Sequence, residues 1–215
     1  MARAFERPAT IALPESEGEG LALEGLFVPI DGSGRGGSLI APPHPLMGGS
    51  MESPVVAELA FASERAGRSS LRFNWRGVGA SGGRASGEIA DADVDYASAT
   101  AFLIETAPGP WMACGYSFGA LAAIRAAERS PAPDWLLLVA PPTAMLDADR
   151  LARFPGHTLI LAGQHDAWVD AVALSALAHD SERMRVEVIP RCDHFFLAGL
   201  GDISRLAGEW LSGLD

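Results

Sequence analysis

The chain has 215 residues, of which 48% are hydrophobic and 20% are charged. This composition is that of an ordinary globular protein, and the length suffices for one well-buried core. A formal net charge of −11 at pH 7 opposes binding to nucleic-acid backbones and to anionic membrane surfaces. We therefore expect neither nucleic acid nor a membrane as a partner.

Signals for export, membrane insertion and metal binding are missing from the sequence. The first eight residues hold no apolar core of a signal peptide, and no apolar run approaches the roughly 18 residues of a membrane span. The two cysteines, Cys114 and Cys192, show no C-x-x-C or metal-ligand spacing. No repeat or break in composition marks a domain boundary. We expect one domain over residues 1–215, located in the cytoplasm, with reduced thiols and no metal or cofactor.

The predicted elements begin with a hairpin and continue as an α/β alternation. Two short strands flank a turn rich in glutamate and glycine, and from residue 38 onward apolar strand-like runs alternate with helical segments. This alternation is typical of a twisted, mostly parallel sheet of about eight strands with helices on both faces. The expected strands are 10–13, 21–28, 39–41, 70–74, 111–116, 135–140, 158–162 and 185–189, and the expected helices are 55–66, 91–105, 120–129, 169–178 and 203–211.

The link between residues 142 and 157 is short and rich in aspartate and arginine. It offers only about fifteen residues, which are too few for a lid domain with a core of its own. We therefore expect a site that is open to solvent and that suits short or exposed acyl groups.

A nucleophile elbow is the first chemical signature. Gly115, Ser117 and Gly119 form the pattern G-x-S-x-G at the turn between the expected strand 111–116 and the helix 120–129. A serine at such a turn adopts a strained backbone conformation, so the residues two before and two after it must be small. The N-terminus of the following helix would stabilise negative charge beside the serine. Ser117 is therefore the candidate nucleophile.

A serine nucleophile needs an imidazole and a carboxylate at the carboxyl ends of other strands. Asp166 follows the penultimate expected strand and is the candidate acid. Asp170 is the alternative, although it stands directly before a helix, where an aspartate commonly serves as the N-cap. His194 follows the last expected strand and is the candidate general base. The chain order Ser117, Asp166, His194 is the order expected for a nucleophile elbow of this architecture.

Two backbone N–H groups are the candidate oxyanion hole. One belongs to Phe118, the residue after the nucleophile. The other is expected in the loop after the first parallel strand, where Pro43 and Pro45 cannot donate. Leu46 offers the first amide after the His-Pro turn, and His44 is expected to brace this loop by hydrogen bonding.

A glycine-rich segment at 72–83 does not predict a phosphate site. A dinucleotide-binding fingerprint needs G-x-G-x-x-G opening a helix, whereas these glycines continue into the flexible stretch 84–87, and the chain contains no Walker lysine. We interpret the segment as a shaped loop beside the site, with Asn74 and Arg76 bracing the loop instead of touching substrate.

Taken together, these motifs resemble the α/β-hydrolase superfamily, and within it the small lidless enzymes related to dienelactone hydrolases. The resemblance covers nearly everything from residue 39 to 211. It is carried by His44-Pro45-Leu46-Met47-Gly48-Gly49, Asn74-Trp75-Arg76-Gly77-Val78-Gly79-Ala80-Ser81, Gly115-Tyr116-Ser117-Phe118-Gly119, Asp166 and Asp193-His194-Phe195-Phe196. It implies an eight-stranded α/β-hydrolase fold and hydrolysis of an ester or thioester through an acyl-enzyme.

One departure from this family bears on the substrate. Dienelactone hydrolases proper use a cysteine nucleophile, whereas this chain has Ser117, which favours a carboxylesterase. The expected substrate is a small-molecule ester or thioester. Acyl transfer and cleavage of a carrier thioester would use the same triad, and a degenerate hydrolase that only binds ligand is a further alternative. Aromatic side chains that could wall an acyl pocket are Trp75, Tyr116, Phe118, Trp168, Phe195 and Phe196, although such residues often belong to the core.

Overall fold

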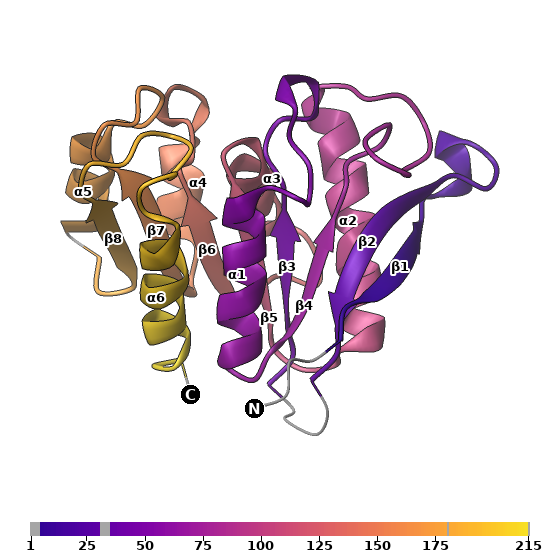
Figure 1. The fold of residues 1–215 in the computed structure, drawn as a ribbon, viewed down its shortest axis with the longest axis horizontal. Coiled ribbons are helices and arrows are strands. Elements are labelled where there is room, and N and C mark those ends of the chain that lie inside the picture. The colour runs from indigo at the N-terminus through magenta and orange to yellow at the C-terminus, as the bar shows by residue number, and fades with distance from the viewer. Residues whose placement is uncertain (1–4, 31–34, 180, 215) are drawn as a thin grey trace.

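The computed structural model describes residues 5–30, 35–179 and 181–214. Eight strands form one sheet in the order β1-β2-β4-β3-β5-β6-β7-β8 (Figure 1). The strands are β1 (Arg7–Ala12), β2 (Ala22–Val28), β3 (Gly37–Ala41), β4 (Ser69–Phe73), β5 (Trp111–Tyr116), β6 (Trp135–Val139), β7 (His157–Gly163) and β8 (Met184–Ile189). The helices are α1 (Pro54–Arg65), α2 (Ile89–Thr106), α3 (Phe118–Ala126), α4 (Ala148–Arg153), α5 (Ala171–His179) and α6 (Leu200–Leu211), with 3-10 turns η1 (Glu15–Glu17), η2 (Pro45–Met47) and η3 (Thr143–Met145).

The predicted sheet is confirmed. β1 and β2 form the antiparallel hairpin, and β2 pairs antiparallel with β4. From β4 through β3 to β8 every neighbouring pair is parallel. All the parallel strands therefore end at one edge of the sheet, which is the upper edge in Figure 1. In open parallel sheets this edge carries the ligand site.

The ends of the predicted helices lie within three residues of the observed ends, and side-chain capping explains two differences from the prediction. The stretch expected to be only an Asp/Arg-rich link contains η3 and the short helix α4, which begins where Asp147 accepts the Arg150 N–H at 2.9 Å. The helix expected from residue 169 begins at Ala171, because Asp170 accepts the Ala173 N–H at 2.9 Å. Aspartate at an N-cap satisfies a donor that the helix leaves unpaired.

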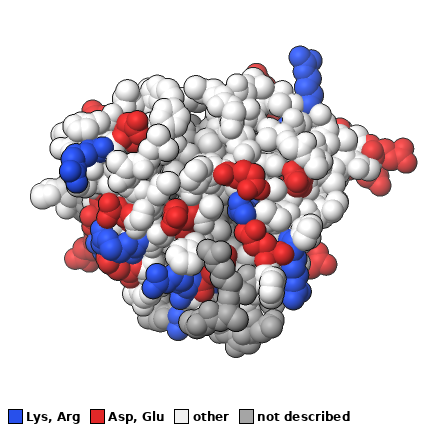
Figure 2. All heavy atoms as spheres, viewed as in Figure 1, with Lys and Arg blue, Asp and Glu red and all other residues white. Residues whose placement is uncertain are grey.

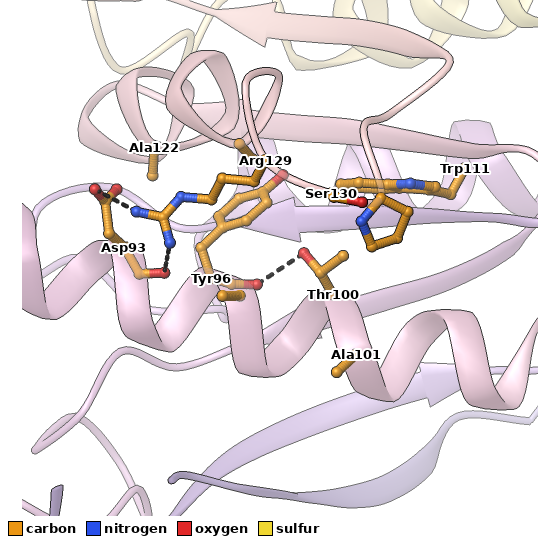
Figure 3. A pocket seen from close by; sticks show the side chains of 11 residues that line it. Asp93, Tyr96, Thr100, Ala101, Trp111, Ala122, Arg129 and Ser130 are labelled. Atoms are coloured by element: carbon orange, nitrogen blue, oxygen red, sulfur yellow. Dashed lines mark hydrogen bonds and ion pairs between the residues drawn. The ribbon is translucent and has the colours of Figure 1, made fainter. Parts of the chain in front are cut away.

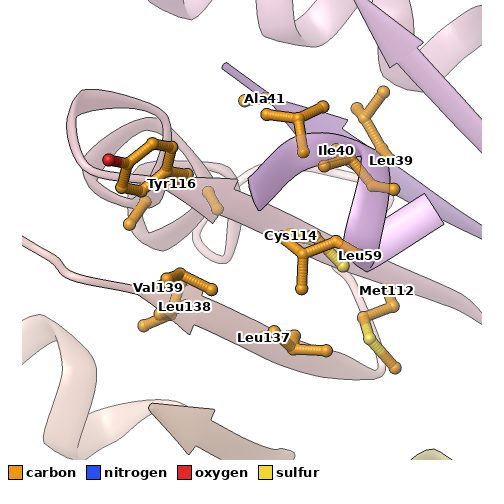
Figure 4. Packing of buried hydrophobic residues seen from close by; sticks show 14 of the residues in the cluster. Leu39, Ile40, Ala41, Leu59, Met112, Cys114, Tyr116, Leu137, Leu138 and Val139 are labelled. Atoms are coloured by element: carbon orange, nitrogen blue, oxygen red, sulfur yellow. The ribbon is translucent and has the colours of Figure 1, made fainter. Parts of the chain in front are cut away.

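The helices cover both faces of the sheet. α1 and α6 pack against each other on one face, and α2 and α3 lie on the other (Figure 1). The central strands are apolar because both of their faces are covered. Ile40, Cys114 and Leu137 are register partners across β3, β5 and β6, and each is 0% exposed. Leu59 of α1 belongs to the same core cluster (Figure 4).

Charged side chains of both signs are interspersed on the face drawn in Figure 2, and they form no continuous basic patch there. Several arginines pair with acidic groups, as Arg76 does with Asp91 and Asp95. No helix within the described residues has the length and hydrophobicity needed to cross a membrane.

Close backbone packing joins α3 to the sheet. A Cβ atom on Gly115 would lie 2.1 Å from the Gly119 carbonyl oxygen, and one on Gly119 would lie 2.4 Å from the Ala41 carbonyl oxygen. These contacts are with backbone, which cannot rotate away as a flexible side chain can. Glycine at both positions is therefore required for β3, β5 and the start of α3 to meet.

Replacement of Gly119 by alanine is expected to lower the free energy of unfolding by about 1–3 kcal/mol, because the new methyl group overpacks a backbone contact. Gly208→Ala is the matched control, since a Cβ at Gly208 in α6 would have no atom within 4 Å. Alanine is favoured over glycine inside a helix by about 0.5–1 kcal/mol, so this variant should gain stability. Urea denaturation measures both, and shifts of the same sign would contradict the packing argument.

Candidate active site

Ser117 occupies a strained turn between β5 and α3. Its backbone has φ 57° and ψ −116°, a conformation that side-chain-bearing residues rarely adopt. The Ser117 N–H donates to the carbonyl of Val139 at 2.8 Å, which ties the turn to the end of β6. The side chain thus stands at the carboxyl edge of the sheet, with the N-terminus of the nine-residue helix α3 directly behind it.

The structure brings the three sequence-predicted residues Ser117, His194 and Asp166 into one hydrogen-bonded chain. His194 Nε2 lies 2.9 Å from Ser117 Oγ, and His194 Nδ1 lies 2.7 Å from Asp166 Oδ2. All three residues are buried. The second carboxylate oxygen, Asp166 Oδ1, accepts the Trp168 N–H at 2.9 Å, which fixes the orientation of the carboxylate. This arrangement can pass a proton from the hydroxyl to the imidazole and stabilise the imidazolium that results.

Asp170, the alternative acid, lies outside this chain of hydrogen bonds. Its Oδ1 caps α5, and its N–H donates to Thr143 Oγ1 at 3.0 Å. Thr143 N–H in turn donates to the Trp168 carbonyl at 3.1 Å. Asp170 therefore helps to hold the loop after β6 against the loop that carries Asp166.

Two aromatic rings hold the imidazole of His194. The Tyr116 hydroxyl donates to the His194 carbonyl at 2.7 Å, and the two ring centroids lie 5.5 Å apart. Trp168 packs with its ring centroid 4.4 Å from that of His194 at an interplanar angle of 76°. Burial, followed by the charges of Asp166 and Asp193, raises the pKa of Tyr116, so its hydroxyl remains a donor at neutral pH. No sequence pattern signals this anchor, because its partner is 78 positions away.

Ser117 opens into an apolar cavity of about 560 Å³. Among the described residues that line it, Asp170 is the charged one. Two of the aromatic residues considered for an acyl pocket, Phe118 and Trp168, do line this cavity. The others do not: Trp75, Tyr116 and Phe196 are buried in the core, and Phe195 is exposed next to His194. The lining residues are His44, Met47, Ser117, Phe118, Leu121, Pro142, Thr143, Ala144, Met145, Ala167, Trp168, Val169 and Asp170.

The Leu46 N–H, the predicted second oxyanion donor, is engaged within its own loop. It donates to His44 Nδ1 at 3.2 Å, and the Leu46 side chain lines a separate hollow together with Arg76. His44 itself lines the Ser117 cavity, and its ring packs 4.8 Å from that of Phe118. The His44 N–H makes no backbone hydrogen bond within the described part of the chain. His44 is therefore a further candidate for the second donor beside Leu46, and its ring braces the loop as expected.

The glycine-rich loop is braced as the sequence predicts. Asn74 accepts the Met51 N–H at 2.8 Å and donates to Glu24 at 2.9 Å. Arg76 pairs with three carboxylates, those of Glu17, Asp91 and Asp95. These contacts satisfy the polar groups of both side chains locally. They tie the loop to the hairpin and to α2.

A second hollow of about 120 Å³ lies beside α2 and α3 (Figure 3). Tyr96, Thr100 and Trp111 contribute to its wall, and Arg129 is held by an ion pair with Asp93 at 2.8 Å. The residues that line it include no histidine or cysteine. It therefore lacks the nucleophile and base that the Ser117 cavity brings together.

The two cysteines are free and buried. Burial raises the pKa of both the Cys114 and the Cys192 thiol, which keeps them neutral and unreactive at pH 7. The described residues contain no cluster of histidine, cysteine, aspartate and glutamate that could hold a metal ion. Of the candidate nucleophiles Ser117, Cys114 and Cys192, Ser117 is thus the one that lies next to a histidine base.

Tyr116→Phe is expected to lower the free energy of unfolding by about 1–3 kcal/mol, because it leaves the buried His194 carbonyl without a donor. Tyr96→Phe is the matched control, since the Tyr96 hydroxyl is equally buried but reaches the Cys114 carbonyl only at 3.4 Å. Its removal should cost less. Denaturant titration of both variants checks the difference, and equal losses would argue against Tyr116 as the anchor.

Comparison with known proteins gives a consistent picture. No protein-family model matches the chain. An uncharacterised protein of Rickettsia prowazekii is 29% identical over 185 residues, which cover 81% of this chain and 77% of that protein. An alpha-beta serine hydrolase homologue from Coxiella burnetii is 27% identical, with a TM-score of 0.83 over 95% of this chain and 97% of the other. A lidless serine hydrolase from Xanthomonas campestris is 24% identical, with a TM-score of 0.77 over 96% and 94%. The chain has the α/β-hydrolase fold and is similar to small serine hydrolases of that fold, a lidless one among them.

Proposed function

We propose that this protein is a serine hydrolase that cleaves carboxylic esters or thioesters of small molecules through an acyl-enzyme. The observation that carries the proposal is the chain of hydrogen bonds from Ser117 through His194 to Asp166, with Ser117 lining an apolar cavity. The likeness to serine hydrolases supports the reaction class. The serine at the elbow, with both cysteines buried and protonated, favours ester hydrolysis by an oxygen nucleophile.

The first half of the reaction forms the acyl-enzyme. Ser117 Oγ attacks the acyl carbon while His194 Nε2 accepts its proton, and Asp166 stabilises the imidazolium through Nδ1–H. The oxyanion receives hydrogen bonds from the N–H groups of Phe118 and His44, and the α3 N-terminus adds a favourable dipole. The tetrahedral intermediate then collapses, and the leaving oxygen takes the proton from His194.

The second half releases the acid. Water donates a proton to His194 Nε2 and attacks the acyl carbon, and a second tetrahedral intermediate collapses to return the proton to Ser117. The absence of a lid domain favours hydrolysis over acyl transfer, because an open cavity admits water freely. The same three side chains therefore serve both halves of the cycle.

Ser117→Ala is expected to reduce kcat for p-nitrophenyl acetate by several orders of magnitude, on the order of 10⁴ to 10⁶, since the acyl-enzyme cannot form. Labelling by a fluorophosphonate probe should be lost at the same time, because the probe reacts only with an activated serine. Ser204→Ala, at a half-buried position of α6, is the control. Undiminished hydrolysis by Ser117→Ala would overturn the assignment, and absence of labelling in the unaltered protein would favour a ligand-binding role.

Asp166→Asn is expected to lower kcat by about 10⁴-fold, because an amide stabilises the wrong imidazole tautomer and not the imidazolium. Asp170→Asn is the matched comparison: asparagine still caps α5, so kcat/KM should change by less than about tenfold. Steady-state kinetics with one ester substrate measures both. Losses of similar size would mean that Asp170 shares the role of the acid.

A further inference from the structure

We propose that Trp168 and Phe195 form a subsite for an uncharged aromatic leaving group, and that the cavity beside Ser117 receives the acyl group. This inference rests on the proposed function and specifies its substrate class. It arises from the position of two exposed aromatic rings next to His194. Neither ring is needed for the hydrogen bonds of the triad.

The two rings form a cluster with the imidazole. The ring centroids of Phe195 and His194 lie 5.9 Å apart, with an interplanar angle of 88°. The ring centroids of Trp168 and Phe195 lie 6.2 Å apart, with an interplanar angle of 71°. These edge-to-face arrangements are the favourable ones for aromatic pairs. Yet Phe195 is 58% exposed and Trp168 is 46% exposed. Large apolar side chains left in water beside a reactive group are typical of a binding surface.

The chemistry fixes where the leaving group must lie. Its oxygen takes the proton from His194 Nε2, so the atoms attached to that oxygen must lie next to the imidazole. Three rings surround the imidazole, and one of them, Tyr116, is only 4% exposed. The exposed rings are those of Trp168 and Phe195. A leaving group beside His194 therefore contacts these two rings.

The acyl group has a separate place. Phe118, Leu121 and Met145 line the cavity in front of Ser117, whereas Phe195 does not. Trp168 lines the acyl cavity and also contacts Phe195, so it lies between the acyl cavity and the leaving-group subsite. The cavity volume of about 560 Å³ exceeds what an acetyl group needs and leaves room for a longer acyl chain. The two halves of an ester thus meet different groups of side chains.

The charges around the site favour an uncharged leaving group. Asp170 lines the cavity, and Asp193 accepts the Phe195 N–H at 3.0 Å. No arginine is among the residues that line the cavity, and the chain contains no lysine. A phosphate-bearing or carboxylate-bearing leaving group beside Phe195 would meet the negative charge of Asp193. A neutral aromatic alcohol meets two apolar rings instead.

The test compares two butyrate esters whose alcohols have similar acidity but different shape, benzyl butyrate and ethyl butyrate. Phe195→Ala is expected to lower the ratio of their kcat/KM values (benzyl over ethyl) by about three- to tenfold, the effect of one lost aromatic contact. Phe195→Tyr keeps the ring and should keep the ratio. Phe61→Ala, which removes an exposed aromatic side chain from α1, should leave both values unchanged.

A variant of the cavity tests the acyl site, and it should change the preference for acyl length and not the preference for the alcohol. Leu121→Phe narrows the cavity, so it should lower kcat/KM for ethyl octanoate relative to ethyl acetate while the benzyl-to-ethyl ratio keeps its original value. Single-turnover measurement of acyl-enzyme breakdown adds a second readout. The alcohol has already departed at that stage, so the Phe195→Ala loss must be confined to acylation.

The outcomes separate this inference from the proposed function. An unchanged benzyl-to-ethyl ratio in Phe195→Ala overturns the leaving-group subsite, and so does a slower breakdown of its acyl-enzyme, which would mean that Phe195 acts by positioning His194. If the unaltered protein forms no acyl-enzyme with either ester, the proposed function itself fails. A lowered ratio with unaltered breakdown supports both.

Discussion

The contact between the backbones of β3, β5 and α3 is the constraint on which the site depends. A Cβ on either Gly115 or Gly119 would come within 2.4 Å of a carbonyl oxygen, so only glycine lets the helix start directly at the end of the strand. This sharp turn forces Ser117 to φ 57° and places its hydroxyl at the carboxyl edge of the sheet. The strain is balanced by the 2.8 Å bond from the Ser117 N–H to β6. Every catalytic role proposed for the chain starts from the resulting position of Oγ.

Parallel topology then supplies the partners. Because β5, β7 and β8 run in the same direction, the loops that follow them carry Ser117, Asp166 and His194 to one edge. The distances of 2.9 Å and 2.7 Å within the triad depend on finer contacts. Tyr116 fixes the backbone of His194, and the Trp168 N–H fixes the carboxylate. Tyr116, the last residue of β5 and the one before the nucleophile, thus also holds the base His194.

The surroundings of the triad offer different contacts to the acyl group and to the leaving group of a substrate. The cavity is apolar on the side of Leu121 and Met145, and the exposed rings of Trp168 and Phe195 stand beside the imidazole. Acidic side chains dominate the nearby charges, in keeping with a net charge of −11. Such a site offers shape and apolar surface to a neutral ester and no counter-charge to an anionic one. In a fold without a lid domain, selectivity must come from these fixed walls.

The sequence alone determined the sheet, the elbow and the identity of the three candidate catalytic residues, because each follows from local periodicity or from position after a strand. It missed α4, since six residues with a capping aspartate resemble a charged linker. It named the Leu46 amide as the second oxyanion donor and His44 only as a brace, and it gave no sign that the Leu46 N–H bonds to the His44 ring, because that contact depends on turn geometry. Tertiary structure decided which aromatic residues lie in the core and which line the cavity beside Ser117. That distinction depends on contacts between loops far apart in the chain, where neighbouring residues carry no information about the partner.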